Sequence, residues 1–242
     1  MLCLLTAILP AVIAADCVIL LHGLIRPPDS MRAMAQHLDN VGFKIANIGY
    51  PSREHPIEEL APLALQDGVA ECRRLTEALS GMDYHIVTHS LGGILTRIYL
   101  RDHDIPELGR VVMLGPPNQS SEIVDTLRDV PGFAAVNGPA GAQLGTDPAS
   151  VPKTLGPVNL ELGVIAGTDS MNALLSSMLP DADDGKVSVA ATRVDGMRDF
   201  ITLPVTHTFM MRDAEVMRQT RHFLTEGHFD HSKSVTAPVA AP

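Results

Sequence analysis

The chain has 242 residues, of which 45% are hydrophobic and only 4% aromatic, and its formal net charge is -10. A chain of this length can bury a full core as one domain, because single domains extend to roughly 250 residues. Nucleic acid is excluded as an expected partner, since phosphate contacts need clustered Lys and Arg and the chain has no basic run. Composition therefore indicates one acidic globular domain.

Residues 1–15 carry no charge and end in small side chains before Asp16. This pattern is typical of the apolar part of a signal peptide, although no Lys or Arg precedes it. The segment is too short for a helix across a bilayer, which needs about 20 residues, so we expect no stable membrane span. We predict export to the periplasm or the medium. The alternative is a cytoplasmic protein in which residues 1–15 form a buried N-terminal element.

From Cys17 onward, short apolar runs alternate with amphipathic stretches, as in a parallel sheet with crossover helices. Strands are expected at Cys17–Leu21, Lys44–Ile48, Tyr84–Thr88, Arg110–Leu114, Leu160–Ala166 and Phe200–Val205. Helices are expected at Ser30–Val41, Ile57–Leu79, Leu91–Asp102 and Asp213–Glu226. In the first helix, Ser30 is a plausible N-cap and Gly42 a stop. The pattern predicts an α/β fold with one domain over residues 16–226.

Two segments lack this alternation. Pro and Gly make up ten of the 27 residues from Pro131 to Pro157, without a sustained helical or strand period. We interpret residues 116–157 as a loop insertion that is either a lid over a binding site or a passive surface excursion. Residues 227–242 are small, polar and rich in Pro and Ala, which predicts a flexible C-terminal tail.

Cys17 and Cys72 are the two cysteines outside the expected signal peptide. An even pair in an exported chain suggests one disulfide, whereas two buried free thiols are the alternative for a cytoplasmic location. Cys17 begins a strand, and Cys72 lies toward the end of a helix that runs antiparallel to the strands. Both residues are therefore expected at the same edge of the sheet, which makes a bridge geometrically reasonable.

The clearest catalytic pattern is a buried strand that runs into Ser90 and is followed by Gly92, Gly93 and a helix. A serine on such a strained strand-to-helix turn exposes its hydroxyl as a nucleophile, and the turn needs small neighbours because strand and helix approach closely. Thr88 stands where this motif usually has its first glycine. The competing interpretation is an ordinary serine N-cap of a helix.

Two backbone amides are candidates for an oxyanion hole. The first strand ends in His22-Gly23, which places the N–H of Leu24 where it can point at a developing oxyanion, although His22 could simply be a buried histidine. The second donor would be the N–H of Leu91, the residue after the nucleophile.

A histidine and an acid are needed to complete a triad, and chain order in this architecture is Ser, acid, His. His207 follows the last strand and precedes the last helix, so it can reach Ser90 as a general base. Asp169 directly follows the preceding strand, so position alone favours it as the acid. Asp184 begins a compact turn into an extended segment over Val187–Val189. Both aspartates could also be part of an acidic surface loop.

Together these segments resemble the bacterial lipase and esterase branch of the α/β-hydrolase fold, from about Cys17 to Glu226. The resemblance rests on strand-His22-Gly23-Leu24, on His89-Ser90-Leu91-Gly92-Gly93 and on Gly115-Pro116-Pro117-Asn118 after the next strand. It implies a compact α/β-hydrolase fold, a mostly parallel sheet with helices on both faces. In that family the triad acid is the Asp of an Asp-Gly-x-Val-Ser turn, which favours Asp184 over Asp169.

The predicted function is hydrolysis of a carboxylic ester, most plausibly an acyl lipid ester, through an acyl-enzyme on Ser90. The same residues would serve an acyltransferase, a thioesterase or an amidase, and a non-catalytic binding protein could keep the fold as a scaffold. We expect no metal ion and no organic cofactor. The expected partners are a small-molecule or lipid ester and, at most, transient contact with a lipid surface.

Overall fold

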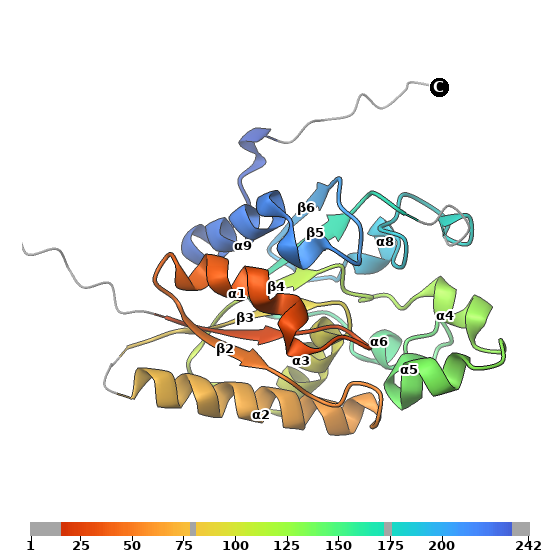
Figure 1. Cartoon of the computed structure of the whole chain (residues 1–242), viewed down its shortest axis with the longest axis horizontal. Coiled ribbons are helices and arrows are strands. Elements are labelled where there is room, and N and C mark those ends of the chain that lie inside the picture. Colours follow the sequence, from red (N-terminus) through yellow and green to blue (C-terminus); the bar gives the residue numbers. More distant parts are fainter. Residues whose placement is uncertain (1–15, 78–80, 172–175, 234–242) are drawn as a thin grey trace, which may run out of the picture.

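The computed structural model describes residues 16–77, 81–171 and 176–233; the segment 1–15, expected to be a signal peptide, lies outside them. Within this part of the chain, one sheet of parallel strands has the order β2-β1-β3-β4-β5-β6 (Figure 1). The strands are β1 Cys17–Leu21, β2 Lys44–Ile48, β3 Tyr84–His89, β4 Leu108–Leu114, β5 Leu162–Gly167 and β6 Asp199–Leu203. The α/β class and the mostly parallel sheet are confirmed.

All the expected strands are present, and only their ends differ. For example, β4 begins at Leu108 instead of Arg110, because Leu108 pairs with Tyr84 of the neighbouring strand. Similarly, β6 ends at Leu203, where its pairing with Gly167 of β5 ends. Strand ends are decided by the partner strand, which a local pattern does not contain.

Helices cover both faces of the sheet. The long helices α2 (Ile57–Thr76) and α3 (Leu91–Asp102) lie on one face, and α1 (Arg32–Asp39) and α9 (Ala214–Glu226) lie on the other (Figure 1). None of the helices in the described segments is both long and apolar enough to cross a membrane.

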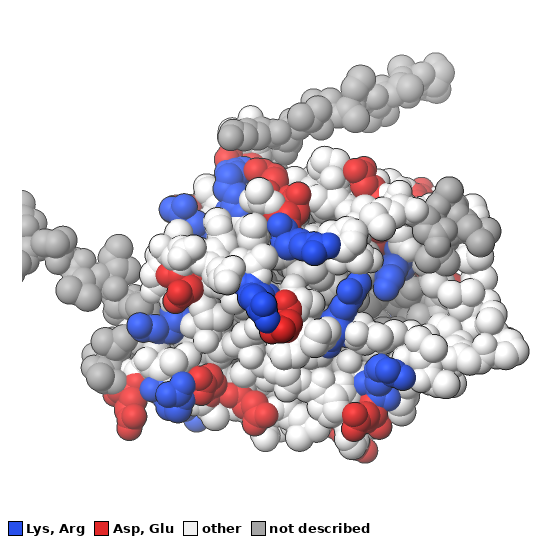
Figure 2. All heavy atoms as spheres, viewed as in Figure 1, with Lys and Arg blue, Asp and Glu red and all other residues white. Residues whose placement is uncertain are grey.

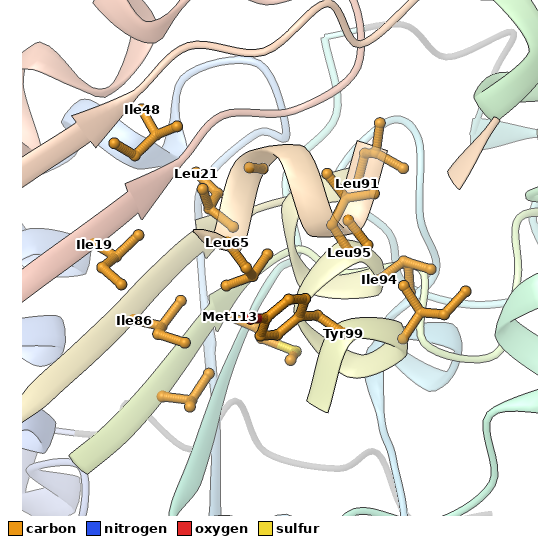
Figure 3. Close-up of a cluster of buried hydrophobic side chains, with 14 of the residues drawn as sticks. Ile19, Leu21, Ile48, Leu65, Ile86, Leu91, Ile94, Leu95, Tyr99 and Met113 are labelled. Carbon is orange, nitrogen blue, oxygen red and sulfur yellow. The ribbon is translucent and has the colours of Figure 1, made fainter. Parts of the chain in front are cut away.

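Each face of the sheet has its own apolar core. Ile19 and Leu21 of β1 pack with α2 and α3, as Figure 3 shows, whereas Val18 and Leu20 pack in the cluster on the α1 and α9 side. Successive side chains of a strand point to opposite faces. The strands read as continuous apolar runs because both faces are buried.

The first helix begins differently from the expectation. A 3-10 turn, η1 (Pro28–Met31), precedes α1, and Ser30 lies inside it. The Ser30 hydroxyl donates to the Pro27 carbonyl instead of capping α1, so its predicted N-cap role is wrong. Pro27 and Pro28 set the chain into this turn before the amphipathic stretch begins, since proline fixes φ near the helical value. Gly42, with φ of 105°, ends the helix as expected.

The segment 116–157 contains short helices, although its sequence lacks a sustained period. They are α4 (Glu122–Leu127), α5 (Phe133–Ala142) and α6 (Val151–Thr154), and they lie beyond the carboxyl ends of the strands (Figure 1). Gly138, with φ of 65°, interrupts α5, and a Cβ there would lie 2.0 Å from the Arg53 carbonyl oxygen. The interruption divides the apolar pattern, which explains why no period is visible.

The turn after Asp184 also differs from the expectation. The predicted extended segment Val187–Val189 ends early, because the helix α8 (Val189–Thr192) begins there. The Ser188 hydroxyl accepts a hydrogen bond from the Ala191 N–H and caps this helix.

The expected C-terminal tail begins with residues that pack on the domain. Gly227 ends α9 with φ of 79°, and Phe229 is only 1% exposed. Asp230 forms an ion pair with Arg218 of α9, and η3 (His231–Lys233) follows. The buried aromatic ring therefore anchors residues 227–233, while 234–242 lie outside the described residues.

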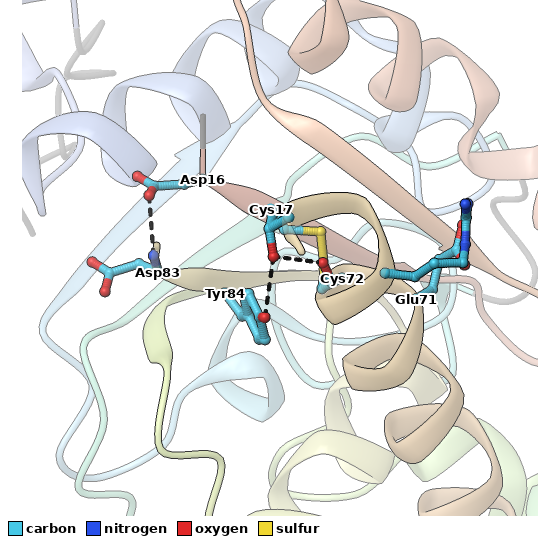
Figure 4. Close-up of a disulfide and its surroundings, with 8 residues drawn as sticks. Asp16, Cys17, Glu71, Cys72, Asp83 and Tyr84 are labelled. Carbon is cyan, nitrogen blue, oxygen red and sulfur yellow. Dashed lines mark hydrogen bonds and ion pairs between the residues drawn. A yellow bond between two sulfur atoms is a disulfide. The ribbon is translucent and has the colours of Figure 1, made fainter. Parts of the chain in front are cut away.

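A disulfide joins Cys17 of β1 to Cys72 of α2, with 5.6 Å between the Cα atoms (Figure 4). Both half-cystines are fully buried. The bridge lies at the amino end of β1, where the antiparallel course of α2 brings its last turns. The bridge joins the two cysteines for which the sequence suggests a disulfide.

Candidate active site

Ser90 lies on a sharp turn between β3 and α3. Its backbone has φ of 53° and ψ of -118°, in the region that non-glycine residues rarely adopt. The Ser90 N–H donates to the Leu114 carbonyl at 2.9 Å, and the Gly93 N–H donates to the Ser90 carbonyl at 3.0 Å. These two bonds hold the strained Ser90 backbone between the end of β4 and the start of α3.

Glycines allow the close approach of backbone around this turn. A Cβ on Gly92 would lie 2.9 Å from the Leu21 carbonyl oxygen, and a Cβ on Gly23 would lie 2.7 Å from Nδ1 of His89. A Cβ on Gly93 would instead meet the side chains of Met113 and Pro116. A larger residue at Gly92 would separate the end of β1 from the start of α3, and one at Gly23 would collide with the His89 side chain at the end of β3.

Ser90, His207 and Asp184 form one hydrogen-bonded chain. Ser90 Oγ lies 3.0 Å from His207 Nε2, and His207 Nδ1 lies 2.7 Å from Asp184 Oδ2. The histidine side chain is 5% exposed and that of the aspartate is 0% exposed. With Nδ1–H donating to the carboxylate, Nε2 is left to accept the serine proton, which is the arrangement of a nucleophile, a base and its orienting acid.

The turn after Asp184 holds the carboxylate in place. Asp184 Oδ1 accepts hydrogen bonds from the backbone N–H groups of Lys186 and Val187, and the Asp184 carbonyl accepts from the His207 N–H at 2.9 Å. By contrast, Asp169 is exposed and lines a different hollow beside Pro204 and Val205. Of the two candidate acids, the structure brings Asp184 and not Asp169 to His207.

His89, predicted as part of the motif, supports His207. Its Nε2–H donates to the His207 carbonyl at 2.9 Å, and the two ring centroids are 4.7 Å apart. Burial, and to a lesser degree the charge of His207, hold the pKa of His89 well below its ordinary value. A neutral imidazole therefore lies behind the candidate base.

His22 supports the loop after β1. Its Nδ1–H donates to the Gly23 carbonyl, and its Nε2 accepts from the Tyr50 N–H at 3.3 Å. The ring stacks on Tyr50 with 4.0 Å between centroids, and the Tyr50 hydroxyl donates to the His22 carbonyl. Burial lowers the pKa of His22, so the ring is a neutral structural group here.

The two expected oxyanion donors flank Ser90. Leu91 is the first residue of α3, and Leu24 lies in the loop that begins with Gly23. Neither amide N–H is used in a turn or loop hydrogen bond in the described part of the chain. Both are thus free to donate to an oxygen on a group attacked by Ser90.

Ser90 and His207 open into a pocket of about 230 Å³. Most of its wall is apolar and comes from Leu24, Ile123, Val124, Leu127, Phe133 and Leu144. All of these residues except Leu24 lie in the segment interpreted as an insertion: three in α4, Phe133 in α5, and Leu144 in the loop between α5 and α6. No cluster that could hold a metal ion is found among the described His, Cys, Asp and Glu residues.

Sequence reasoning missed Gly115, which follows β4. A Cβ on Gly115, whose φ is 54°, would lie 2.9 Å from Asp184 Oδ2 and 3.1 Å from His207 Nδ1. The Asp184 carboxylate and the His207 imidazole can meet here because this position has no side chain. The sequence feature that could have identified this position is the glycine that begins the Gly-Pro-Pro-Asn segment.

A buried Arg97–Asn118 pair also escaped prediction. Arg97 Nη1 donates to the carbonyl and the amide oxygen of Asn118, and Nη2 donates to the Gly156 carbonyl. Asn118 Nδ2 donates to the Thr192 carbonyl. Burial lowers the pKa of Arg97 to about 10. The network ties α3, the loop after β4 and α8 together, and a helical arginine alone gives no sign of it.

No protein-family model and no curated protein sequence matches the chain. Solved structures do resemble it. The mature lipase BlEst2 of Bacillus licheniformis is 17% identical, with 88% of this chain and 91% of that chain covered and a TM-score of 0.65. Phospholipase PlaB of Legionella pneumophila, in complex with thio-NAD, is 16% identical, with coverage of 86% and 56% and a TM-score of 0.67.

A metagenomic carboxyl esterase is a further structural neighbour, at 17% identity and a TM-score of 0.58, with 81% of this chain and 65% of that chain covered. The present chain thus spans little more than half of PlaB and two thirds of this esterase. At these identities the likeness concerns the fold alone. The chain has the α/β-hydrolase fold that is found in these bacterial lipases and esterases.

Proposed function

We propose that the protein is a serine hydrolase of carboxylic esters, with Ser90 as nucleophile, His207 as general base and Asp184 as the orienting acid. The observation that carries the proposal is the continuous hydrogen-bonded chain from Asp184 through His207 to Ser90 at the wall of an apolar pocket. The lipases and esterases among the structural neighbours support ester hydrolysis in general.

The reaction begins when His207 Nε2 takes the Ser90 proton and Oγ attacks the ester carbonyl. The N–H groups of Leu24 and Leu91 stabilise the resulting oxyanion, a contribution of about 3 to 4 kcal/mol per donor. His207 then passes its proton to the alcohol oxygen, which leaves. Water, deprotonated by His207, attacks the acyl-enzyme and releases the acid. Asp184 stabilises the imidazolium in both halves of the reaction.

The pocket suggests which acyl groups fit. Its volume of about 230 Å³ lies just below the common range for ligand pockets, roughly 300 to 1,000 Å³. Its apolar wall favours a hydrocarbon chain over a polar acyl group. We therefore expect short and medium acyl chains to react faster than long ones.

The test is hydrolysis of p-nitrophenyl esters of graded acyl length by the wild type and by Ser90→Ala. The wild type should turn over the shorter esters, and the variant should lose at least about 1,000-fold in kcat, since loss of a triad serine can cost about 10⁶-fold. Ser30→Ala, whose hydroxyl lies in η1 outside the pocket, is the matched control. Equal rates for wild type and Ser90→Ala would remove Ser90 from the mechanism.

We further propose that the protein works in an oxidising compartment after export. The support is the buried Cys17–Cys72 disulfide, because such bridges persist outside the reducing cytosol. Cell fractionation with detection of the mature N-terminus tests this, and a chain retained in the cytosol with residues 1–15 intact would contradict it.

A further inference from the structure

Two basic side chains line the candidate active-site pocket together with Ser90 and His207. Arg26 follows the Leu24 loop after β1, and Lys186 lies in the turn that carries Asp184. They come from segments far apart in the sequence, yet both reach the same hollow. The mechanism proposed above uses neither of them.

Neither side chain forms an ion pair with a carboxylate of the described residues. In the part of the chain that the structure describes, no hydrogen bond or ion pair from either side chain to a carboxylate is found, and no Asp or Glu lines the pocket. Elsewhere Arg32, Arg110 and Arg218 each lie against a carboxylate. On the face drawn in Figure 2, blue side chains lie at the edge of a hollow to the right of centre.

The two charges act on each other. Loss of hydration lowers the pKa of the Lys186 ammonium, and the charge of Arg26 lowers it further, while Asp184 acts in the opposite direction. Lys186 and Arg26 also lower the pKa of His89 in the same pocket. The Lys186 side chain is exposed and Arg26 is half-buried, so an anion can reach both cations from solvent, and its charge would offset their mutual repulsion. This local positive charge contrasts with the formal net charge of -10 of the whole chain.

We propose that the substrate is an ester that carries an anionic group, a carboxylate or a phosphate, close to the scissile bond, and that Arg26 and Lys186 bind this group. The inference rests on the proposed ester hydrolysis and names its substrate class. An acyl chain can lie against the apolar wall that α4 and α5 form. The anionic group can then bind at Arg26 and Lys186, which belong to other segments of the chain. A guanidinium and an ammonium are the usual protein partners of both anions.

Matched pairs of substrates test the proposal. The carboxylate pair is the butyrate ester of 4-nitrophenol against the butyrate ester of 5-hydroxy-2-nitrobenzoate, which differ by one carboxylate on the same nitrophenol. The phosphate pair is dibutyrylglycerol against dibutyrylglycerol phosphate. In at least one pair the wild type should have a kcat/KM about tenfold higher for the anionic member. The preference should shrink at high salt, because exposed charges are screened. The pair that shows the preference identifies the anion.

Substitutions assign the preference to residues. Arg26→Gln and Lys186→Gln should each reduce the anionic-to-neutral ratio of kcat/KM about tenfold, mainly through KM. Arg32→Gln and Lys153→Gln change the same residue types outside the pocket and should keep the wild-type ratio. A wild-type ratio near one in both pairs would overturn the proposal, as would an equal change of the ratio in all four variants.

The two proposals can fail separately. If the wild type hydrolyses the neutral esters without preferring either anion, ester hydrolysis stands and the anion site is wrong. If no ester is hydrolysed, calorimetric titration of Ser90→Ala with the anionic esters tests the anion site by binding alone. Binding that is lost in Ser90→Ala/Arg26→Gln would support the anion site, and no binding to Ser90→Ala would overturn it.

Discussion

Asp184 and Asp169 both follow strand β5 in the chain, but only one of their carboxylates can orient His207. The Asp184 carboxylate is buried and accepts from His207 Nδ1, whereas Asp169 is exposed in another hollow. We predict that Asp184→Asn lowers kcat by about 1,000- to 10,000-fold, because an amide cannot hold the required imidazole tautomer. Asp169→Asn should change kcat by less than about threefold. Ester hydrolysis at saturating substrate measures both.

A folding control accompanies this comparison. Circular dichroism and thermal unfolding of both aspartate variants establish that each is folded before its rate is interpreted. If folded Asp169→Asn loses activity while Asp184→Asn keeps it, the assignment of the acid is wrong.

Buried histidines make stability depend on pH. Burial lowers the pKa of His22, His85 and His89 in the folded protein, whereas in the unfolded chain each stays near its ordinary value of about 6.5. Below that pH the unfolded chain therefore binds more protons than the folded protein. The free energy of unfolding should fall as the pH drops from 7 to 5, by up to about 1.4 kcal/mol per pH unit for each such histidine.

His89 should contribute most clearly, since its pKa is lowered furthest. In His89→Gln the slope of unfolding free energy against pH should become shallower between pH 7 and 5, whatever the change in stability at pH 7. His55→Gln, which removes an exposed imidazole, is the matched control. Urea unfolding at several pH values measures the slopes, and parallel curves for His89→Gln and wild type would contradict the prediction.

At the scale of elements, the contact between β1 and α3 depends on Gly92. An alanine Cβ there would lie 2.9 Å from the backbone oxygen of Leu21, which cannot move without disturbing the strand. We predict that Gly92→Ala lowers the free energy of unfolding by about 1 to 3 kcal/mol, the usual effect of overpacking, and that it also lowers kcat by displacing the neighbouring Leu91 N–H.

Gly93→Ala is the comparison on the next residue of the same helix. Its Cβ would meet Met113 Sδ and Pro116 Cβ, both at 3.1 Å, and the flexible methionine can move away. The loss of stability should therefore be smaller than for Gly92→Ala. Equal losses in chemical unfolding would show that backbone approach is not the cause.

The elements differ in how well a local pattern predicts them. Strands such as β1 are continuous apolar runs because both faces are buried, so their positions follow from sequence alone. The helix α5 is interrupted at Gly138 by the nearby Arg53 carbonyl, a contact between segments 85 residues apart (138 minus 53). A contact of that kind leaves no local period.

At the scale of the whole molecule, the disulfide links β1 to the far end of α2. It spans 55 residues of chain, and in the chain-entropy model a loop of that length contributes about 4 kcal/mol to stability. We predict that reduction lowers the unfolding midpoint in urea, with a loss of stability of this order at most. The double variant Cys17→Ser/Cys72→Ser should be destabilised similarly and should not respond to reductant. A wild type that titrates two free thiols without reductant would contradict the bridge.

The sequence by itself determined the α/β-hydrolase fold, the nucleophile turn at Ser90 and the place of His207, because these depend on short segments and on chain order. The family resemblance favoured Asp184 over Asp169, whereas position after the strand favoured Asp169, and only the tertiary structure shows which of the two carboxylates lies against the imidazole of His207. Tertiary structure likewise decided that Gly115 leaves room for the dyad and that Arg26 and Lys186 share a pocket. Proximity between distant segments is created by packing, and no local pattern records it.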